Sequence, residues 1–268
     1  MESKILVGPM TGREERGDRV GQWLEGLEKL HFADLTPAEV GRALRALSSC
    51  YVERRGRLAE GGALSGAGKR AAFALFYGPL HFLVVDHIVR GLPSASDTIS
   101  QVYDLGCGTG AAGAAWALQR TGVRIAGVDR HPWAVSEANW TYGMLGLTGR
   151  AAQGDLARAR LGGGRATAIL AAYAMNELPA PARQGMLARL LEAAAAGTAV
   201  LIVEPIARRM SPWWAEWSRA FLEAGGRADE WRFPSTLPPP QRDLARAAGL
   251  RPHELTARSL FARGTGRS

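Results

Sequence analysis

Three glycines and an aspartate stand close together where they could hold a cofactor. The stretch from Asp104 to Gly110 reads DLGCGTG, follows short apolar residues, and precedes an alanine-rich segment. This order predicts a strand, a tight loop and a helix. Glycine lets the loop backbone approach a ligand and adopt positive φ, and the free amides at the helix N-terminus point toward whatever binds there. We therefore expect a bound cofactor on this loop.

Two further aspartates end predicted strands of the same kind. Asp129 closes the apolar stretch 125–129, and Asp155 follows Ala151-Ala152-Gln153. An ionised carboxylate only accepts hydrogen bonds, so at the end of such a strand it suits the hydroxyl groups of a ribose. These positions predict a nucleotide-containing cofactor.

The glycine loop permits two cofactor classes. Residues 108–113 fit the G-x-G-x-x-G dinucleotide fingerprint, which is a weak signal alone. The longer D-x-G-x-G-x-G pattern from Asp104 resembles the first motif of class I S-adenosylmethionine-dependent methyltransferases. Strand-like segments follow at 125–129, 151–155, 168–179, where the strand runs out into a polar loop, and 199–205, in the order found in that family. We therefore favour S-adenosylmethionine, with S-adenosylhomocysteine as its product, over a nicotinamide dinucleotide.

The resemblance implies a set of cofactor-binding residues. Asp129 would accept hydrogen bonds from the ribose hydroxyls, and Asp155 from the adenine amine, while the amide of Leu156 would donate to the adenine ring. Asp104 would either contact the methionine part of the cofactor or cap the amides of the loop. The full set comprises Asp104, Gly106, Cys107, Gly108, Gly110, Asp129, Arg130, Asp155, Leu156 and Ala172.

Candidate catalytic residues follow the fourth predicted strand, where the family places groups that face the transferring methyl. They are Tyr173, Asn176 and Glu177, in the segment YAMNELP. Glu177 could accept a proton from the acceptor or could cap the next helix. The segment is not the N-P-P-Y motif of many base-amine and glutamine methyltransferases, which weakens an adenine-N6 assignment.

Four residues are candidates for binding the acceptor: Tyr77, His81, Trp213 and Trp214. The tryptophans stand at helical spacing in an aromatic stretch, where packing is the alternative role. The N-E-L-P loop, the V-E-P end of strand five and Tyr77-Gly78-Pro79 are similar to the small-ribosomal-subunit methyltransferase-like family, which includes mitochondrial ribosome assembly factors. The iron–sulfur cysteines of members of that family have no counterparts here.

The alternation of strands and helices from Gln101 predicts the element order that would position these residues. The predicted fold is α/β, with a doubly wound, mostly parallel sheet of the seven-stranded type and a helix between each pair of successive strands from the first to the fifth.

Residues 1–95 are predicted to be helical. The segment T-P-A-E at 36–39 predicts a capping box at the start of a helix that buries Val40, Leu44, Leu47 and Tyr51, Pro79 predicts a kink, residues 91–100 a linker, and Pro132 the start of the second helix of the α/β region. The resemblance implies that the N-terminal helices form a cap that helps select the substrate, and we expect residues 96–268 to form the Rossmann-like methyltransferase domain. Within it, we expect 206–238 to be a tryptophan-rich helical insertion after strand five.

Composition bounds the function without choosing the acceptor. The 268 residues carry a net charge of +8, mostly from scattered arginines, which fits either a solvated basic surface or contact with RNA. Cys50 and Cys107 are the only cysteines, so no cysteine-based metal cluster is expected, and no metal ligand set was identified. The apolar run 80–89 is too short to span a bilayer, and we expect a cytoplasmic protein.

Three functions remain open at this point. The first is methyl transfer to a small molecule, the second is an RNA- or ribosome-associated methyltransferase or assembly factor, and the third is a non-catalytic S-adenosylmethionine-binding protein. The helical cap and the aromatic stretch favour the first. The sequence indicates neither the acceptor atom nor the oligomeric state.

Overall fold

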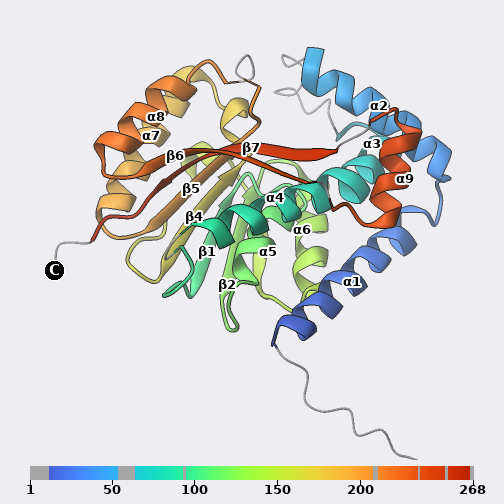
Figure 1. Ribbon diagram of the computed structural model, residues 1–268, viewed down its shortest axis with the longest axis horizontal. Helices are drawn as coiled ribbons and strands as arrows, with labels where there is room; N and C mark the ends of the chain where they lie inside the picture. The colour runs from blue at the N-terminus through green and yellow to red at the C-terminus, as the bar shows by residue number, and fades with distance from the viewer. Residues whose placement is uncertain are drawn as a thin grey trace, which may run out of the picture.

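The computed structural model describes residues 12–53, 64–92, 95–207, 211–234, 236–250 and 253–265. Its centre is a seven-stranded sheet in the order β3-β2-β1-β4-β5-β7-β6 (Figure 1). Strands β1 to β5 are parallel, and β7 runs antiparallel to both of its neighbours. The strands are β1 Gln101–Leu105, β2 Arg124–Asp129, β3 Thr148–Gln153, β4 Thr167–Ala172, β5 Ala199–Glu204, β6 Arg227–Pro234 and β7 Glu254–Ala262.

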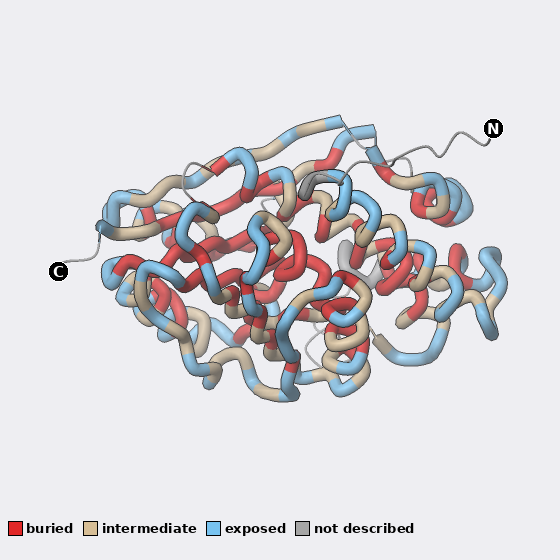
Figure 2. Tube along the Cα trace, turned by 90° about the horizontal axis from the view of Figure 1, so that it is seen from below, coloured by how far each residue is buried: buried red, intermediate tan, exposed pale blue. Residues whose placement is uncertain are grey.

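Two hydrophobic cores lie on the two faces of the sheet. Alternate residues of a strand point to opposite faces, so Ala168 and Leu170 of β4 belong to the first core while Ile169 and Ala171 belong to the second. Helices α4 (Gly78–Gly91), α5 (Ala111–Ala117) and α6 (Pro132–Met144) contribute to the first core, and α7 (Ala180–Ala195) and α8 (Trp214–Glu223) to the second. Figure 2 places the buried segments, in red, through the middle of the molecule. The central strands β4 and β5 are therefore buried on both faces, as the doubly wound prediction requires.

Four helical segments precede α4 and β1 in the described part of the chain. They are α1 Gly12–His31, α2 Pro37–Glu53, α3 Ala67–Ala72 and the π-helical turn η3 Phe73–Tyr77. The capping box predicted at the start of α2 is confirmed, because the Thr36 amide donates to Glu39 Oε2 at 2.8 Å and the Glu39 amide to Thr36 Oγ1 at 3.3 Å. Val40, Leu44 and Leu47 are buried along one face of α2, also as predicted.

A helix from the other end of the chain completes this group. Helix α9 (Pro239–Ala247), between β6 and β7, lies beside α2 and α3 on the right of Figure 1. Arg45 of α2 donates to the carbonyls of Ala247 at 2.8 Å and Ala248 at 3.3 Å. A cation at a helix C-terminus satisfies carbonyls that have no partner within the helix. The helical cap is thus built from both ends of the chain, which the predicted division at residues 95 and 96 did not anticipate.

The kink predicted at Pro79 takes the form of the π-helical turn η3. Proline lacks the amide hydrogen that the carbonyl of Leu75, four residues earlier, would accept in a regular α-helix. The Gly78 amide donates to the Phe73 carbonyl, the five-residue spacing of a π turn. Gln241 Nε2 of α9 donates to the Leu75 carbonyl at 3.0 Å, and Gln241 is fully buried. The side chain of Gln241 therefore supplies the hydrogen bond that Pro79 cannot.

Two sequence predictions about the core were wrong. Residues 206–238 are not a helical insertion, because they contain α8 and β6, and β6 is the edge strand of the sheet. The alternation in β6 is incomplete in the sequence because its less exposed face begins with the charged pair Arg227 and Asp229 before Trp231 and Phe233. Between β3 and β4 the structure has only the 3-10 turn η4, Leu156–Arg158, where a full helix was expected; glycines 162–164 occupy much of that short connection.

The stretch Ala67–Gly91 is long and apolar enough to span a membrane by length and composition alone. However, 67% of its most apolar window is buried inside the protein. Its apolar side chains, such as Val85 and Ile88, pack in the first core. The stretch is therefore apolar because its side chains pack in the core of the protein. The predicted linker Gly91–Ser100 lies partly outside the described residues, at 93–94.

Candidate active site

A cavity of about 360 Å³ opens at the carboxyl ends of β1, β2, β4 and β5. Strands β2 and β4 lie on opposite sides of β1, so the chain connections after β1 and β4 leave the sheet toward opposite faces. Ligands of doubly wound folds bind in the crevice between these two connections. Its lining comprises Leu64, Phe73, Tyr77, Leu80, His81, Gly106, Cys107, Gly108, Thr109, Ala111, Ala112, Asp129, Arg130, His131, Ala172, Tyr173, Ala174, Asn176, Glu177, Glu204, Pro205 and Thr256.

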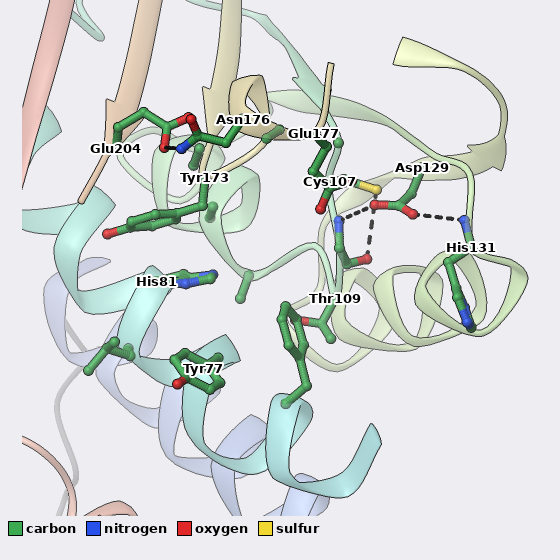
Figure 3. A pocket seen from close by; sticks show the side chains of 18 of the residues that line it. Tyr77, His81, Cys107, Thr109, Asp129, His131, Tyr173, Asn176, Glu177 and Glu204 are labelled. Carbon is green, nitrogen blue, oxygen red and sulfur yellow. Dashed lines mark hydrogen bonds between the residues drawn. The ribbon is translucent and has the colours of Figure 1, made fainter. Parts of the chain in front are cut away.

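Asp129, at the end of β2, is fixed by two backbone amides. Its Oδ2 accepts from the Gly108 amide at 2.9 Å and its Oδ1 from the His131 amide at 2.8 Å (Figure 3). Each carboxylate oxygen has a second lone pair. The side chain is half-buried and faces the cavity, so it can accept further hydrogen bonds from a ligand while it holds the glycine loop.

The glycine loop forms one wall of the cavity. Gly106 has φ of +71°, and a Cβ there would lie 2.6 Å from the Cβ of Ala174, so no other residue fits without displacing that neighbour. Gly108 has φ of +52°, and a Cβ there would stand 3.6 Å from the ring of Phe73 across the cavity. Cys107 is buried, and burial raises the pKa of its thiol and keeps it protonated. We therefore assign Cys107 the role of a small buried side chain in the loop.

Asp104 lies behind the loop and does not line the cavity. Its Oδ2 accepts from the amide of Gly113 in α5 at 3.0 Å, and its side chain is only 1% exposed. Burial raises its pKa to about 7, and Asp129 adds to the shift, while the bond from Gly113 opposes it. Of the two roles left open by the sequence, this position matches support of the loop and helix.

Glu177 and Arg130 form an ion pair at the cofactor end of the cavity. Arg130 Nη2 lies 3.2 Å from Glu177 Oε2, and both side chains keep more than two-fifths of their surface exposed. Partial burial raises the pKa of Glu177, Asp129 adds to the rise, and Arg130 opposes it. Figure 3 places Glu177 beside Cys107 and Asp129, away from His81. A base at Glu177 would therefore lie near Asp129 and not beside the ring of His81.

The amide of Asn176 is occupied by a network that joins three elements. Its Nδ2 donates to Glu204 Oε2 at 2.7 Å and to Ser211 Oγ at 3.0 Å. Its Oδ1 accepts from the indole of Trp213 at 2.9 Å. Asn176 and Glu204 both line the cavity, while Trp213 is buried in the second core. Asn176 is thus suited to fixing the position of Glu204.

Aromatic side chains form the wall opposite the glycine loop. Tyr77 comes from η3, His81 from α4 and Tyr173 from the loop after β4. The rings of His81 and Tyr173 stack with centroids 4.2 Å apart and an angle of 19° between planes (Figure 3). Tyr77 Oη lies 3.0 Å from Ser48 Oγ of α2. Helices of the cap therefore do contribute to the cavity.

Besides Asp104, five of the predicted site residues do not line the cavity. Gly110 begins α5 with φ of +77°. Asp155 is exposed and its Oδ1 caps η4 by accepting from the Ala157 amide at 2.9 Å, and Leu156 lies beside it. Trp213 is buried in the second core, and Trp214 packs against that core. The guanidinium of Arg258 lies 4.2 Å from the Trp214 ring centroid. The substrate-binding role predicted for these tryptophans does not fit their position, because α8 packs on the sheet as a core helix.

The sequence reasoning missed several lining residues. Phe73, Thr109, His131, Glu204 and Thr256 reach the cavity from five separate segments. Glu204 ends β5 as Asp129 ends β2, so its place at a strand end was a usable signal. Thr256 stands on β7, and no local pattern indicates that this strand returns to the cavity. No group of three or more potential metal-ligating His, Cys, Asp or Glu side chains occurs among the described residues.

Comparison with known proteins agrees with this geometry. A family model described as a methyltransferase domain matches residues 102–197. The matched segment holds the glycine loop, Asp129 and the loop after β4, which together form most of the cavity wall. No curated protein matches the sequence at a significant level.

Solved structures are similar to this chain at low sequence identity. A candidate O-methyltransferase from Nostoc punctiforme is 15% identical, with a TM-score of 0.53, and the match covers 83% of this chain and 72% of that one. A magnesium protoporphyrin IX methyltransferase from Synechocystis with bound S-adenosylmethionine is 18% identical, with a TM-score of 0.46 and coverage of 87% and 99%. A candidate RNA methyltransferase from Pyrococcus horikoshii is 13% identical, with a TM-score of 0.43 and coverage of 75% and 87%.

Proposed function

Residues 102–197 form an S-adenosylmethionine-dependent methyltransferase domain, and from this premise we propose that the chain methylates a small-molecule acceptor by direct displacement. The cavity is walled on the acceptor side by residues of the cap, including Phe73, Tyr77 and His81. Such walls suit an acceptor of limited size better than an extended chain, because they surround it on several sides. This enclosure is the observation that carries the proposal.

The residues present fit S-adenosylmethionine. Asp129 can accept hydrogen bonds from ribose hydroxyls, and a Cβ at Gly108 would occupy space in front of the lining residue Phe73 that a ligand can use. Asp129, Glu177 and Glu204 face the cavity, and Arg130 is the one Arg or Lys among its described lining residues. This excess of carboxylates over cations favours, by electrostatic attraction, the positively charged sulfonium group of S-adenosylmethionine. When bound, the cofactor supplies a methyl group on sulfur that a nucleophile can displace.

The chain contributes alignment to this reaction. Asp129 holds the loop and the ribose end, and the loop after β4 carries Tyr173 toward the acceptor side. Holding two reactants in line can lower a barrier by roughly 7–11 kcal/mol. Glu177 is the candidate to take up a proton near the cofactor, and we assign Asn176 the task of holding Glu204 in place.

The proposal is tested with S-adenosylmethionine labelled with tritium in its methyl group. The purified chain is incubated with a heat-treated cell extract, small molecules are separated from RNA and protein by ultrafiltration, and labelled products in the filtrate are separated from unreacted S-adenosylmethionine by chromatography. We expect a labelled small-molecule product, and none with an Asp129→Ala variant. Label confined to RNA would replace this proposal with RNA methylation. No transfer to any fraction, with binding of the cofactor retained, would identify a non-catalytic binding protein.

A further inference from the structure

Four aromatic rings line one end of the cavity and contact one another. Phe73 and Tyr77 have ring centroids 5.8 Å apart, Phe73 and His81 6.1 Å, and Tyr77 and His81 6.0 Å. Tyr173, from the loop after β4, stacks on His81. Tyr77, His81 and Tyr173 are only half-buried, and the surface they keep lies at the cavity. These four residues are called the aromatic end of the cavity below.

Three of the rings stand at four-residue intervals on one continuous helical segment. Phe73, Tyr77 and His81 follow each other from η3 into α4, so they lie on the same side of the segment. The π turn falls on this run, and π turns often occur at functional sites. The helix therefore presents a row of ring faces to the cavity.

Tyr173 reaches this row through an unusual backbone conformation. Its φ is +61°, and it is the one non-glycine residue with positive φ among the described residues. A left-handed conformation costs a non-glycine residue about 1–2 kcal/mol, and such strain concentrates at functional sites. The Tyr173 amide donates to the Val203 carbonyl at 2.8 Å, which helps hold the residue in place. The strained backbone places the ring of Tyr173 over that of His81.

Among the described residues, no positive charge lies at the aromatic end. Burial lowers the pKa of His81 to about 3, so its imidazole is neutral near pH 7. Arg130, the one lining arginine, is paired with Glu177 at the other end of the cavity. An acidic acceptor would find no counter-charge among these rings. Neutral rings offer faces and edges to other flat rings, and such contacts add to the effect of simple burial.

We infer that the acceptor is a planar aromatic or heteroaromatic ring whose hydroxyl or amino group receives the methyl. The ring would bind against Phe73, Tyr77, His81 and Tyr173, with its substituent toward the glycine loop. In the reaction the oxygen or nitrogen forms a bond to the methyl carbon, the carbon–sulfur bond breaks, and the acceptor's proton leaves to solvent or to Glu177. This inference rests on the proposed function and names its substrate class.

Binding of simple ring pairs tests the inference without turnover. The chain, saturated with S-adenosylhomocysteine, is titrated with 2-naphthol and with decahydro-2-naphthol by ligand-observed NMR. The two alcohols have the same carbon skeleton, but only the first is flat and aromatic. We expect 2-naphthol to bind more tightly by about tenfold. Each aromatic contact contributes about 0.5–1.5 kcal/mol, which corresponds to about 2- to 12-fold in affinity.

Three variants of helix α4 assign the effect to the aromatic end. His81→Ala should weaken 2-naphthol binding by about 2- to 12-fold, while His81→Phe keeps a ring and should restore it. His87→Ala is the matched control, because His87 also stacks on an aromatic ring, that of Phe233 at 3.8 Å, but does not line the cavity. His87→Ala should leave the affinity unchanged. Thermal unfolding of each variant checks that it is folded.

Equal binding of both alcohols, or no binding of either, would overturn the inference. So would a His81→Phe variant that binds 2-naphthol no better than His81→Ala while remaining folded. Neither result would affect the transfer of tritium to the small-molecule fraction, so failure of the substrate class can be told apart from failure of the proposed function.

Discussion

The Asp129 carboxylate accepts a 2.9 Å hydrogen bond from the amide of Gly108, so the residue proposed to hold the ribose also holds the loop that surrounds the cofactor. The same carboxylate accepts from the His131 amide, which joins the end of β2 to the start of α6. One side chain thus couples two walls of the cavity. Its removal should affect the shape of the site as well as a contact within it.

We expect Asp129→Ala to weaken the binding of S-adenosylmethionine by about tenfold or more, because hydrogen bonds to charged groups contribute about 1.5–3 kcal/mol each. Equilibrium dialysis with labelled cofactor measures the change. Asp243→Ala is the control, since Asp243 is an exposed residue of α9 whose partner is Arg246. If both variants bind as the wild type does, Asp129 has no role in the site.

Asp104 provides a test based on pH. Its pKa in the folded protein is raised to about 7 from an ordinary value of 3.8. A carboxyl group with a raised pKa contributes stability that is fully present below pH 4 and is lost as the pH rises through 7, because the folded state binds the proton more tightly. Asp104→Asn removes this titration and can still accept the bond from Gly113.

The stability of Asp104→Asn relative to the wild type should therefore increase between pH 5 and pH 7.5. Urea unfolding of both proteins at the two pH values gives this difference, with other titrating groups cancelling between them. A difference that stays constant with pH would mean that Asp104 ionises normally in the folded protein.

Two glycine-to-alanine changes should have opposite effects on stability. Gly185 is exposed within α7 and a Cβ there meets nothing within 4 Å, so Gly185→Ala should stabilise the protein by about 0.5–1 kcal/mol. Gly110 has φ of +77°, and a Cβ there would lie 2.6 Å from the Tyr142 ring, so Gly110→Ala should destabilise it. Urea unfolding measures both, and a stabilising Gly110→Ala would contradict the described loop.

Gln241 should stabilise the fold through the carbonyl of Leu75. Gln241→Met keeps a similar volume but leaves that buried carbonyl without the side-chain donor, at a cost of about 1–3 kcal/mol. Gln184→Met, on the exposed side of α7, is the matched control and should change little. Comparable effects of the two substitutions on the urea midpoint would contradict the assigned role of Gln241.

Local signals in the sequence predicted the elements that carry the cofactor site. The glycine loop, the aspartate that ends β2 and the proline that begins α6 each act within a few residues of themselves, so a single sequence reveals them. Strand β5 was predicted at 199–205 and is observed at Ala199–Glu204, because it is buried on both faces and is apolar from Ala199 to Val203.

Features set by distant contacts could not be predicted in this way. Thr256 reaches the cavity only because β7 inserts between β5 and β6. Gln241 meets Leu75 across 166 positions of the chain. Trp213 and Trp214 have the spacing of a helix that could face either the cavity or the sheet, and packing of α8 against β6 and β7 decides between them.

The central claim is that the cavity between the glycine loop and Asp129 binds S-adenosylmethionine. Isothermal titration of the purified chain with S-adenosylhomocysteine and, separately, with reduced nicotinamide adenine dinucleotide tests it most directly. We predict saturable binding of S-adenosylhomocysteine at one site per chain and none of the dinucleotide. Binding of the dinucleotide without S-adenosylhomocysteine would contradict the claim.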